Sequence, residues 1–139
     1  MGKPRIELPD TFLFTAELQV RVTDLNYGAH LGNDRMLGLV HEARYLYLKS
    51  LGSAELDIGG LRLVVSDAVL TYHAEVFAGD RLGFDIALGE SSARRAEMLY
   101  RVRRLSDDKV VARAATGLAF IDPSEGTVVA PPLERLTPG

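Results

Sequence analysis

The feature that most constrains the fold is one segment with helical periodicity, in a chain whose other segments alternate apolar and polar residues as β-strands do. Over residues 33–51, apolar side chains recur every three or four positions, as on one face of an α-helix. Asn33 at the start of this segment is typical of an N-cap residue, and Gly52 after it is typical of a residue that ends a helix. The sequence therefore predicts one long helix from Asn33 to Leu51.

Alternation of apolar and polar residues predicts five strands around this helix. Their expected ranges are 12–22 before the helix and 61–73, 80–90, 94–104 and 109–121 after it. The short, turn-rich connections between the last three strands favour antiparallel hairpins, and the Pro-rich end, residues 131–139, is expected to fray. One strand, one helix and four strands predict an α+β fold, with an antiparallel sheet against one helix in a single domain, residues 1–139.

Composition excludes several classes of function. The formal net charge of −3 gives no reason to expect nucleic acid as a partner. The chain has no cysteine, which removes disulfides, thiolate nucleophiles and most zinc sites. No apolar run approaches the roughly 20 residues that span a membrane, and the first ten residues lack the apolar region of a secretion signal. We expect a soluble, cytoplasmic protein with no membrane partner.

The predicted sheet also suggests self-association. One helix does not cover the whole of a curved five-stranded sheet, so apolar area and strand edges are left over. We therefore expect a homodimer or a dimer of dimers, in which sheets join edge to edge.

Most of the polar chemistry lies in the segment DLNYGAHLGN, residues 24–33, between the first strand and the helix. It contains an acid, two Asn residues, three glycine or alanine positions and one of the chain's three histidines. Glycine permits tight backbone turns, and the start of a helix offers unpaired N–H groups that favour negative charge. The three histidines show no ligand spacing, so we expect no metal and no cofactor.

This segment resembles the signature D-x-D-x-x-G-H-V-N-N of the hotdog-fold acyl-CoA thioesterases, 4-hydroxybenzoyl-CoA thioesterase-like branch. The run HEARYLYLKSLG downstream resembles the end of that family's helix, and the resemblance continues through LTYHAEVFAGDRL and ATGLAFIDPSEGTVVAPP. It implies a hotdog fold, in which a five-stranded antiparallel sheet wraps around one long helix. It also implies an acyl-CoA thioesterase that hydrolyses its substrate to free acid and coenzyme A, with the site at a homodimer interface.

The sequence departs from the signature at two positions of the site. The family's catalytic carboxylate stands at the second acidic position, which is Asn26 here. The family's glycine before the histidine is replaced by Ala29, and a glycine stands at Gly28 instead. Because an amide is neutral, Asn26 cannot act as a carboxylate nucleophile or as a general base.

The resemblance still assigns roles to the loop. The backbone N–H of Asn33 corresponds to the family's oxyanion-binding amide, and Asn26 is positioned to orient a water molecule or the thioester carbonyl. Three residues are candidates for the base, each with a structural alternative: His30, Asp24 and Glu42. The alternative is a loop-shaping hydrogen bond for His30, a turn or capping contact for Asp24, and an ion pair for Glu42. Tyr27 and Gly28 are candidates for substrate contact.

Arginines crowd the strand predicted over residues 94–104. Arg94 and Arg95 are candidates for binding the phosphates of coenzyme A, because a guanidinium donates two hydrogen bonds to one phosphate. The alternative is a solvated strand face whose arginines pair with Glu97, Asp107 and Asp108.

Two other functions compete with hydrolysis. The run DLNYGAH also resembles the D-x-N-P-x-H signature of (R)-specific enoyl-CoA hydratases, although Tyr27 replaces the proline and His30 comes one residue late. The neutral Asn26 also fits an acyl-CoA-binding protein that has lost catalysis.

Overall fold

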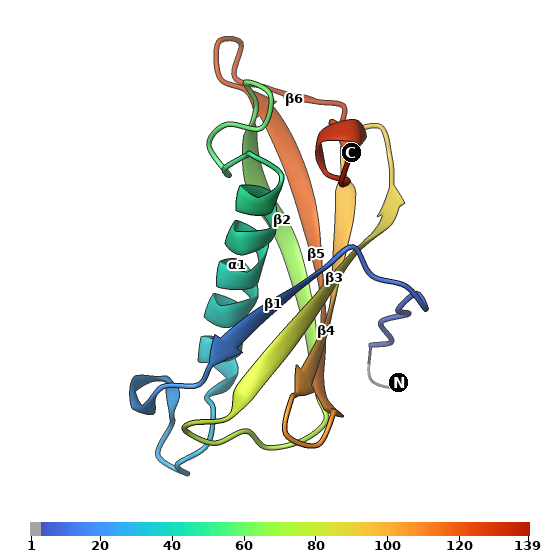
Figure 1. Ribbon diagram of the computed structural model, residues 1–139. Helices are drawn as coiled ribbons and strands as arrows, with labels where there is room; N and C mark the ends of the chain where they lie inside the picture. The colour runs from blue at the N-terminus through green and yellow to red at the C-terminus, as the bar shows by residue number, and fades with distance from the viewer. Residues whose placement is uncertain (1–3) are drawn as a thin grey trace.

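The computed structural model describes residues 4–139 and consists of one long helix and one antiparallel sheet. The helix is α1 (Asn33–Ser50), and the strands are β1 (Phe14–Gln19), β2 (Arg62–Tyr72), β3 (Arg81–Ser91), β4 (Ala96–Arg104), β5 (Lys109–Asp122) and β6 (Thr127–Val129). Two single-turn 3-10 helices are η1 (Val22–Asp24) and η2 (Leu133–Arg135). The order across the sheet is β1-β3-β4-β5-β2, and β6 pairs with β5. Figure 1 shows the curved sheet with α1 lying along it.

The expected α+β hotdog arrangement is confirmed. The helix and all five expected strands form, each within a few residues of its predicted range, and β3, β4 and β5 pair as antiparallel hairpins. The periodic face of α1 is buried against the sheet, with Val40, Ala43 and Tyr47 fully enclosed. Within residues 4–139, no helix has the length and apolarity needed to cross a membrane. The short β6 was not expected, because three residues are too few to show an alternation.

The prediction that residues 131–139 fray is wrong. Leu136 is completely buried and belongs to the main apolar core. The hydroxyl of Tyr47 donates a hydrogen bond to the carbonyl oxygen of Leu136, and burial raises the pKa of Tyr47 to about 12. An apolar anchor with a buried hydrogen bond therefore holds a segment whose prolines alone suggest disorder.

One residue of α1, Arg44, is a buried arginine. Arg44 is 4% exposed, and its Nη1 donates to the hydroxyl of Tyr100 at 3.2 Å. That hydroxyl is 2.8 Å from Oγ1 of Thr116, and Glu55 lies 3.9 Å from the arginine at the outer end. The two terminal nitrogens of the guanidinium thus contact Tyr100 and Glu55, whereas its buried Nε has no hydrogen-bond partner among the described residues. Through Tyr100 and Thr116, Arg44 ties α1 to β4 and β5.

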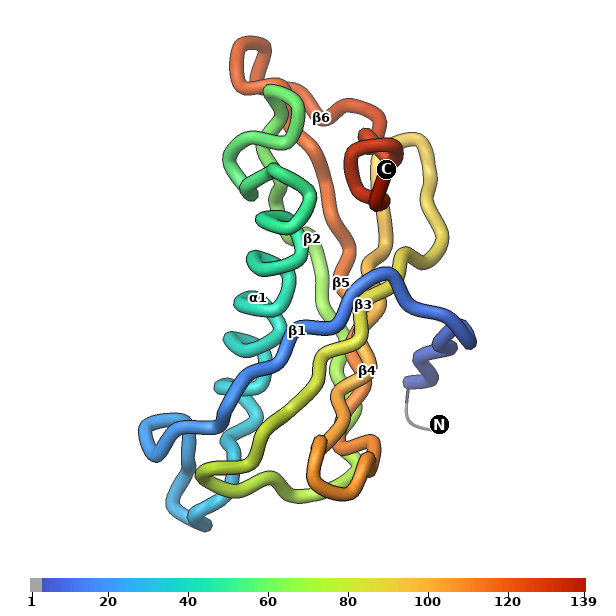
Figure 2. The backbone as a smooth tube through the Cα atoms, viewed as in Figure 1, coloured from blue at the N-terminus to red at the C-terminus, as the bar shows by residue number. Residues whose placement is uncertain are grey.

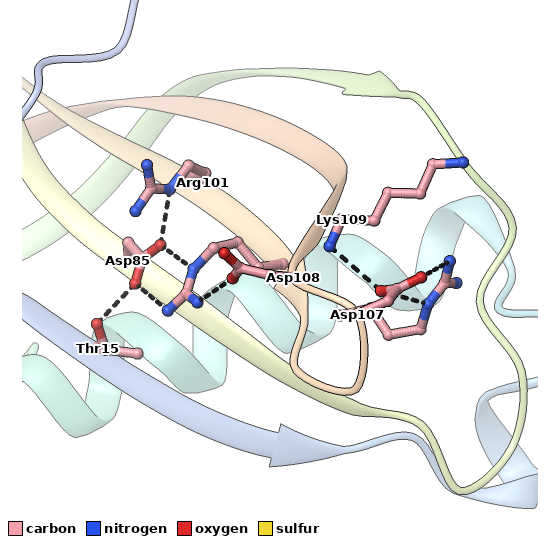
Figure 3. A network of polar contacts seen from close by, with 8 residues as sticks. Thr15, Asp85, Arg101, Asp107, Asp108 and Lys109 are labelled. Carbon is pink, nitrogen blue, oxygen red and sulfur yellow. Dashed lines mark hydrogen bonds and ion pairs between the residues drawn. The ribbon is translucent and has the colours of Figure 1, made fainter.

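A second polar network lies on β3 and β4, around Asp85 (Figure 3). Asp85 is 2% exposed, and its carboxylate accepts hydrogen bonds from Thr15 at 2.6 Å and Arg101 at 2.8 Å. Arg103 donates two more, at 2.6 and 2.9 Å. Burial acts to raise the pKa of Asp85, but the hydrogen bonds from Arg103, Thr15 and Arg101 outweigh it and leave that pKa below its usual value.

We expect Asp85→Asn to lower the free energy of unfolding by about 2 to 4 kcal/mol, because the change leaves two guanidinium groups without their buried counter-charge. Urea denaturation at neutral pH measures this loss.

Asp67→Asn is the matched control, because the carboxylate of Asp67 is half exposed in its pair with Arg95 and exposed pairs contribute roughly 1 kcal/mol or less. Because folding lowers the pKa of Asp85, its charge contributes fully to the free energy of unfolding above the ordinary carboxyl pKa of about 3.9. That contribution is lost as the pH falls below this value. The gap between wild type and Asp85→Asn should therefore shrink at acidic pH. Equal losses in Asp85→Asn and Asp67→Asn would contradict this assignment.

Candidate active site at the start of helix α1

The segment that leads into α1 is fastened by backbone hydrogen bonds to the connection between β2 and β3. The N–H of Val20 donates to the carbonyl of Asp80 at 2.9 Å, and the N–H of Gly79 donates to Val20 at 2.8 Å. Closer to the helix, the N–H of Leu31 donates to the carbonyl of Val76 at 2.6 Å. Figure 2 shows both connections at the same end of the molecule. These bonds fix where the helix begins.

The side chain of Asn26 shapes the exposed tip of this loop. Its Oδ1 accepts a hydrogen bond from the N–H of Gly28 at 2.8 Å, which is an Asx-turn. The backbone groups of Asn26 bond to His30 at 2.9 Å and to Ala29 at 3.0 Å. Because the side-chain oxygen is used within the loop, the amide nitrogen of Asn26 is the group that can donate to a bound molecule.

Two small residues allow the loop to close this tightly. A Cβ added to Gly28 would lie 3.0 Å from Nε2 of His30 and 3.3 Å from Oδ1 of Asn26, so a side chain there would push both groups away. Ala29 has a φ of +61°, a left-handed conformation that costs an L-residue roughly 1 to 2 kcal/mol. Ala29 stands where the signature has glycine, and its conformation is the one for which glycine is suited.

The cap of the helix lies one residue earlier than expected. Gly32 is the N-cap and makes no side-chain capping bond, so the prediction that Asn33 caps the helix is wrong. Asn33 is instead the first helical residue, and within residues 4–139 its N–H has no hydrogen-bond acceptor. Its carbonyl accepts a bond from the hydroxyl of Tyr72 at 2.8 Å. The uncapped N–H and the positive end of the helix dipole favour a bound negative charge at this point.

Two hollows open beside the start of α1. The first, which we call the His30 hollow, has a volume of about 240 Å³ and is lined by His30, Leu31, Asn33, Met36, Tyr72, Ala74, Glu75 and Val76. The second, the Asn26 hollow, has a volume of about 350 Å³ and is lined by Leu25, Asn26, Tyr27, Gly32, Asp34 and Arg35. Four of the candidate site residues line these hollows: His30 and Asn33 line the first, and Asn26 and Tyr27 line the second. A fifth, Gly28, lies in the turn next to His30 and Asn26.

Asp24 and Glu42 line neither hollow. Asp24 is buried, and its carboxylate accepts the N–H of Arg21 at 2.9 Å and lies 3.6 Å from the guanidinium of the same residue. Its carbonyl accepts the N–H of Gly32, so Asp24 holds the base of the loop. Glu42 is exposed on α1, and nine residues of helical rise place it about 14 Å along the axis from Asn33.

Arg94 and Arg95 lie in the turn directly before β4. Arg94 is exposed, and Arg95 forms two hydrogen bonds with Asp67, at 3.2 and 2.7 Å. At the other end of β4, Nη1 of Arg104 donates to the carbonyl oxygen of Glu75 at 2.9 Å. Arg104 is therefore the arginine of this strand that contacts a residue of the His30 hollow.

Sequence reasoning missed two carboxylates of the site, Asp34 and Glu75. Asp34 lies in the first turn of α1, and Glu75 falls in the connection between β2 and β3. A signal for Asp34 existed in the sequence, because it follows directly after the residue that carries the expected oxyanion-binding amide.

Comparison with known proteins identifies the family. The family model of the thioesterase-like superfamily matches residues 20–136. None of the curated proteins matches the chain. A solved 1,4-dihydroxy-2-naphthoyl-CoA thioesterase from Synechocystis is 26% identical, with a TM-score of 0.78 over 86% of this chain and 90% of that one.

Two further structures share the fold at lower identity. A hypothetical protein from Aquifex aeolicus is 24% identical, with a TM-score of 0.79 over 89% of this chain and 99% of its own. A DHNA-CoA thioesterase from Staphylococcus aureus is 16% identical, with a TM-score of 0.74 over 84% of this chain and 78% of its own. With the family match over most of its length, this chain belongs to the thioesterase-like superfamily. Its place in the 4-hydroxybenzoyl-CoA branch stays a prediction.

Ala29→Gly should raise the free energy of unfolding by up to about 1 kcal/mol, since relief of the left-handed strain is partly offset by the greater freedom of glycine in the unfolded chain. Thermal and urea denaturation measure the change. Ala93→Gly, at an exposed turn without positive φ, is the control and should lose stability. A loss of similar size in both variants would show that Ala29 is unstrained.

Proposed function

We propose that this protein hydrolyses acyl-CoA thioesters to a free acid and coenzyme A. The observation that carries the proposal is the uncapped N–H of Asn33, which lies at the start of α1 beside the two hollows. The chain that presents this group belongs to the thioesterase-like superfamily. The Synechocystis relative, a thioesterase for a CoA ester, supports the substrate class.

The chemistry needs an oxyanion site, an oriented water molecule and a base. Water attacks the thioester carbonyl carbon and gives its proton to a base, while the N–H of Asn33 donates to the oxygen that becomes negative. The C–S bond then breaks, and the thiolate recovers the proton as it leaves. The amide nitrogen of Asn26 orients the water or the carbonyl, because its oxygen already bonds to Gly28.

The placement of the candidate bases narrows their roles. His30 lines the His30 hollow together with Asn33, whose N–H is the expected oxyanion donor, and is the candidate base that shares a hollow with that residue. The carboxylate of Asp24 is occupied by Arg21, which also weakens the hydratase alternative, since that reaction needs an Asp and a His acting on one water. Glu42 is too far along α1 to serve its own loop, so it would act only across a dimer interface.

A homodimer completes this proposal. β2 pairs with β5 on one side only, and its apolar side chains Val64, Val65, Val69 and Tyr72 are 36 to 43% exposed. An open edge with exposed apolar residues favours pairing with a second copy.

Arg94 and Tyr27, both exposed, are candidates for contact with the coenzyme A portion of the substrate. Arg95 would have to break its pair with Asp67 to make such a contact.

Wild type should release free thiol from at least one of a panel of short, medium, long and aromatic acyl-CoAs. Asn26→Ala should lower kcat roughly 10- to 100-fold, because the variant loses a positioned donor. Gln19→Ala, which removes an amide bonded only weakly to Gly79 at 3.4 Å, is the matched control and should keep wild-type kcat.

A wild type that releases no thiol from any ester of the panel would overturn hydrolysis. Calorimetric titration with a non-hydrolysable acyl-CoA analogue would then test the alternative of an acyl-CoA-binding protein, which the neutral Asn26 favours.

Wild type should behave as a dimer or larger in light scattering coupled to size exclusion. The double change Val64→Lys and Val65→Lys should shift it toward monomer, because charges on an open strand edge oppose pairing. Val128→Lys is the control, since Val128 is similarly exposed, at 37%, but lies on β6. A monomeric wild type would contradict the dimer.

A further inference from the structure

We propose that Asp34 is the general base of this site and replaces the carboxylate that Asn26 lacks. The inference rests on the proposed thioesterase function and names a catalytic residue for it. Asp34 and Asn26 line the same hollow of about 350 Å³, and Asp34 is the only carboxylate among the residues that line it in the described part of the chain.

Both side chains approach the bare Cα of Gly32. A Cβ added to Gly32 would lie 2.8 Å from Oδ1 of Asp34 and 3.8 Å from Cβ of Asn26. A side chain at this position would therefore displace the carboxylate, and the bare glycine lets Asp34 fold back toward the loop. Gly32 is also an N-cap without a capping side chain, although Ser, Thr, Asp and Asn are preferred there.

The carboxylate of Asp34 is uncommitted. Within residues 4–139 it takes part in no ion pair and no side-chain hydrogen bond, in contrast to Asp24, whose oxygens are held by Arg21. A general base needs a free lone pair within reach of the water that it deprotonates. Its charge also reaches the other hollow, because burial and then the charge of Asp34 raise the pKa of Tyr72.

Asp34 is adjacent in the chain to the residue that carries the expected oxyanion-binding N–H. Asp34 follows Asn33, whose N–H is the expected donor to the developing negative charge. In the proposed step, the water oxygen bonds to the carbonyl carbon and its proton moves to Asp34. When the C–S bond breaks, Asp34 returns this proton to the leaving thiolate, so the carboxylate is regenerated.

An ordinary explanation of Asp34 is that an acid in the first turn stabilises the helix dipole. That role predicts only a change in stability, and any acid in the first turn would fill it. Catalysis predicts a selective loss of kcat and its recovery when a carboxylate is returned to position 26.

The test compares Asp34→Asn, Asp34→Glu and the exchange of both residues, Asn26→Asp with Asp34→Asn. With the acyl-CoA that wild type hydrolyses fastest, Asp34→Asn should lower kcat by roughly 10²- to 10³-fold and leave KM within about threefold. Asp34→Glu should keep part of the activity, and the exchange should recover at least about tenfold over Asp34→Asn. Asp10→Asn, at an exposed position before β1, is the matched control.

Thermal unfolding separates catalysis from folding, because Asp34→Asn should melt within a few degrees of wild type. An active wild type with an unchanged Asp34→Asn would overturn the role of Asp34 and leave the proposed function standing. Loss of activity in Glu75→Gln with none in Asp34→Asn would do the same and move the base to the His30 hollow. A wild type that is inert toward every thioester would overturn both.

Discussion

The position of the candidate site depends on backbone hydrogen bonds between two connections that are distant in sequence. The bond from Leu31 to Val76 places the first turn of α1 against the end of the sheet. Because these bonds involve only the main chain, the side chains of the loop are left to point into the two hollows. Packing in the apolar core holds the helix against the sheet, and these backbone bonds fix the residue at which the helix starts.

Periodicity was sufficient to predict most of the fold. One helical stripe and five alternating segments define their own faces, and an antiparallel sheet against a helix is the arrangement that buries both. The polar interior was beyond this reasoning. Arg44 lies on the apolar stripe, four residues after Val40, but its burial depends on Tyr100 and Thr116, which lie far along the chain. Leu136 likewise depends on a partner in α1.

The sequence predicted which segment carries the candidate site but not how the side chains of that segment are arranged. The loop from Asp24 to Asn33 was correctly placed at the start of the helix, but spacing alone cannot tell which side chains turn outward. Asp24 turns inward to Arg21, and Asp34 folds back over Gly32. Both outcomes depend on local backbone angles. Ala29 adopts a left-handed φ that an alanine in the sequence does not suggest.

The order of strands in the sheet has a consequence for synthesis on the ribosome. β1 pairs with β3, so that Phe14 meets Ile86, and no neighbour in sequence can take the place of that partner. At 5 to 20 residues per second, roughly 4 to 14 s pass between the emergence of these two residues. During this interval β1 and the apolar face of α1 have no sheet to cover them, which makes the nascent chain a natural client for chaperones.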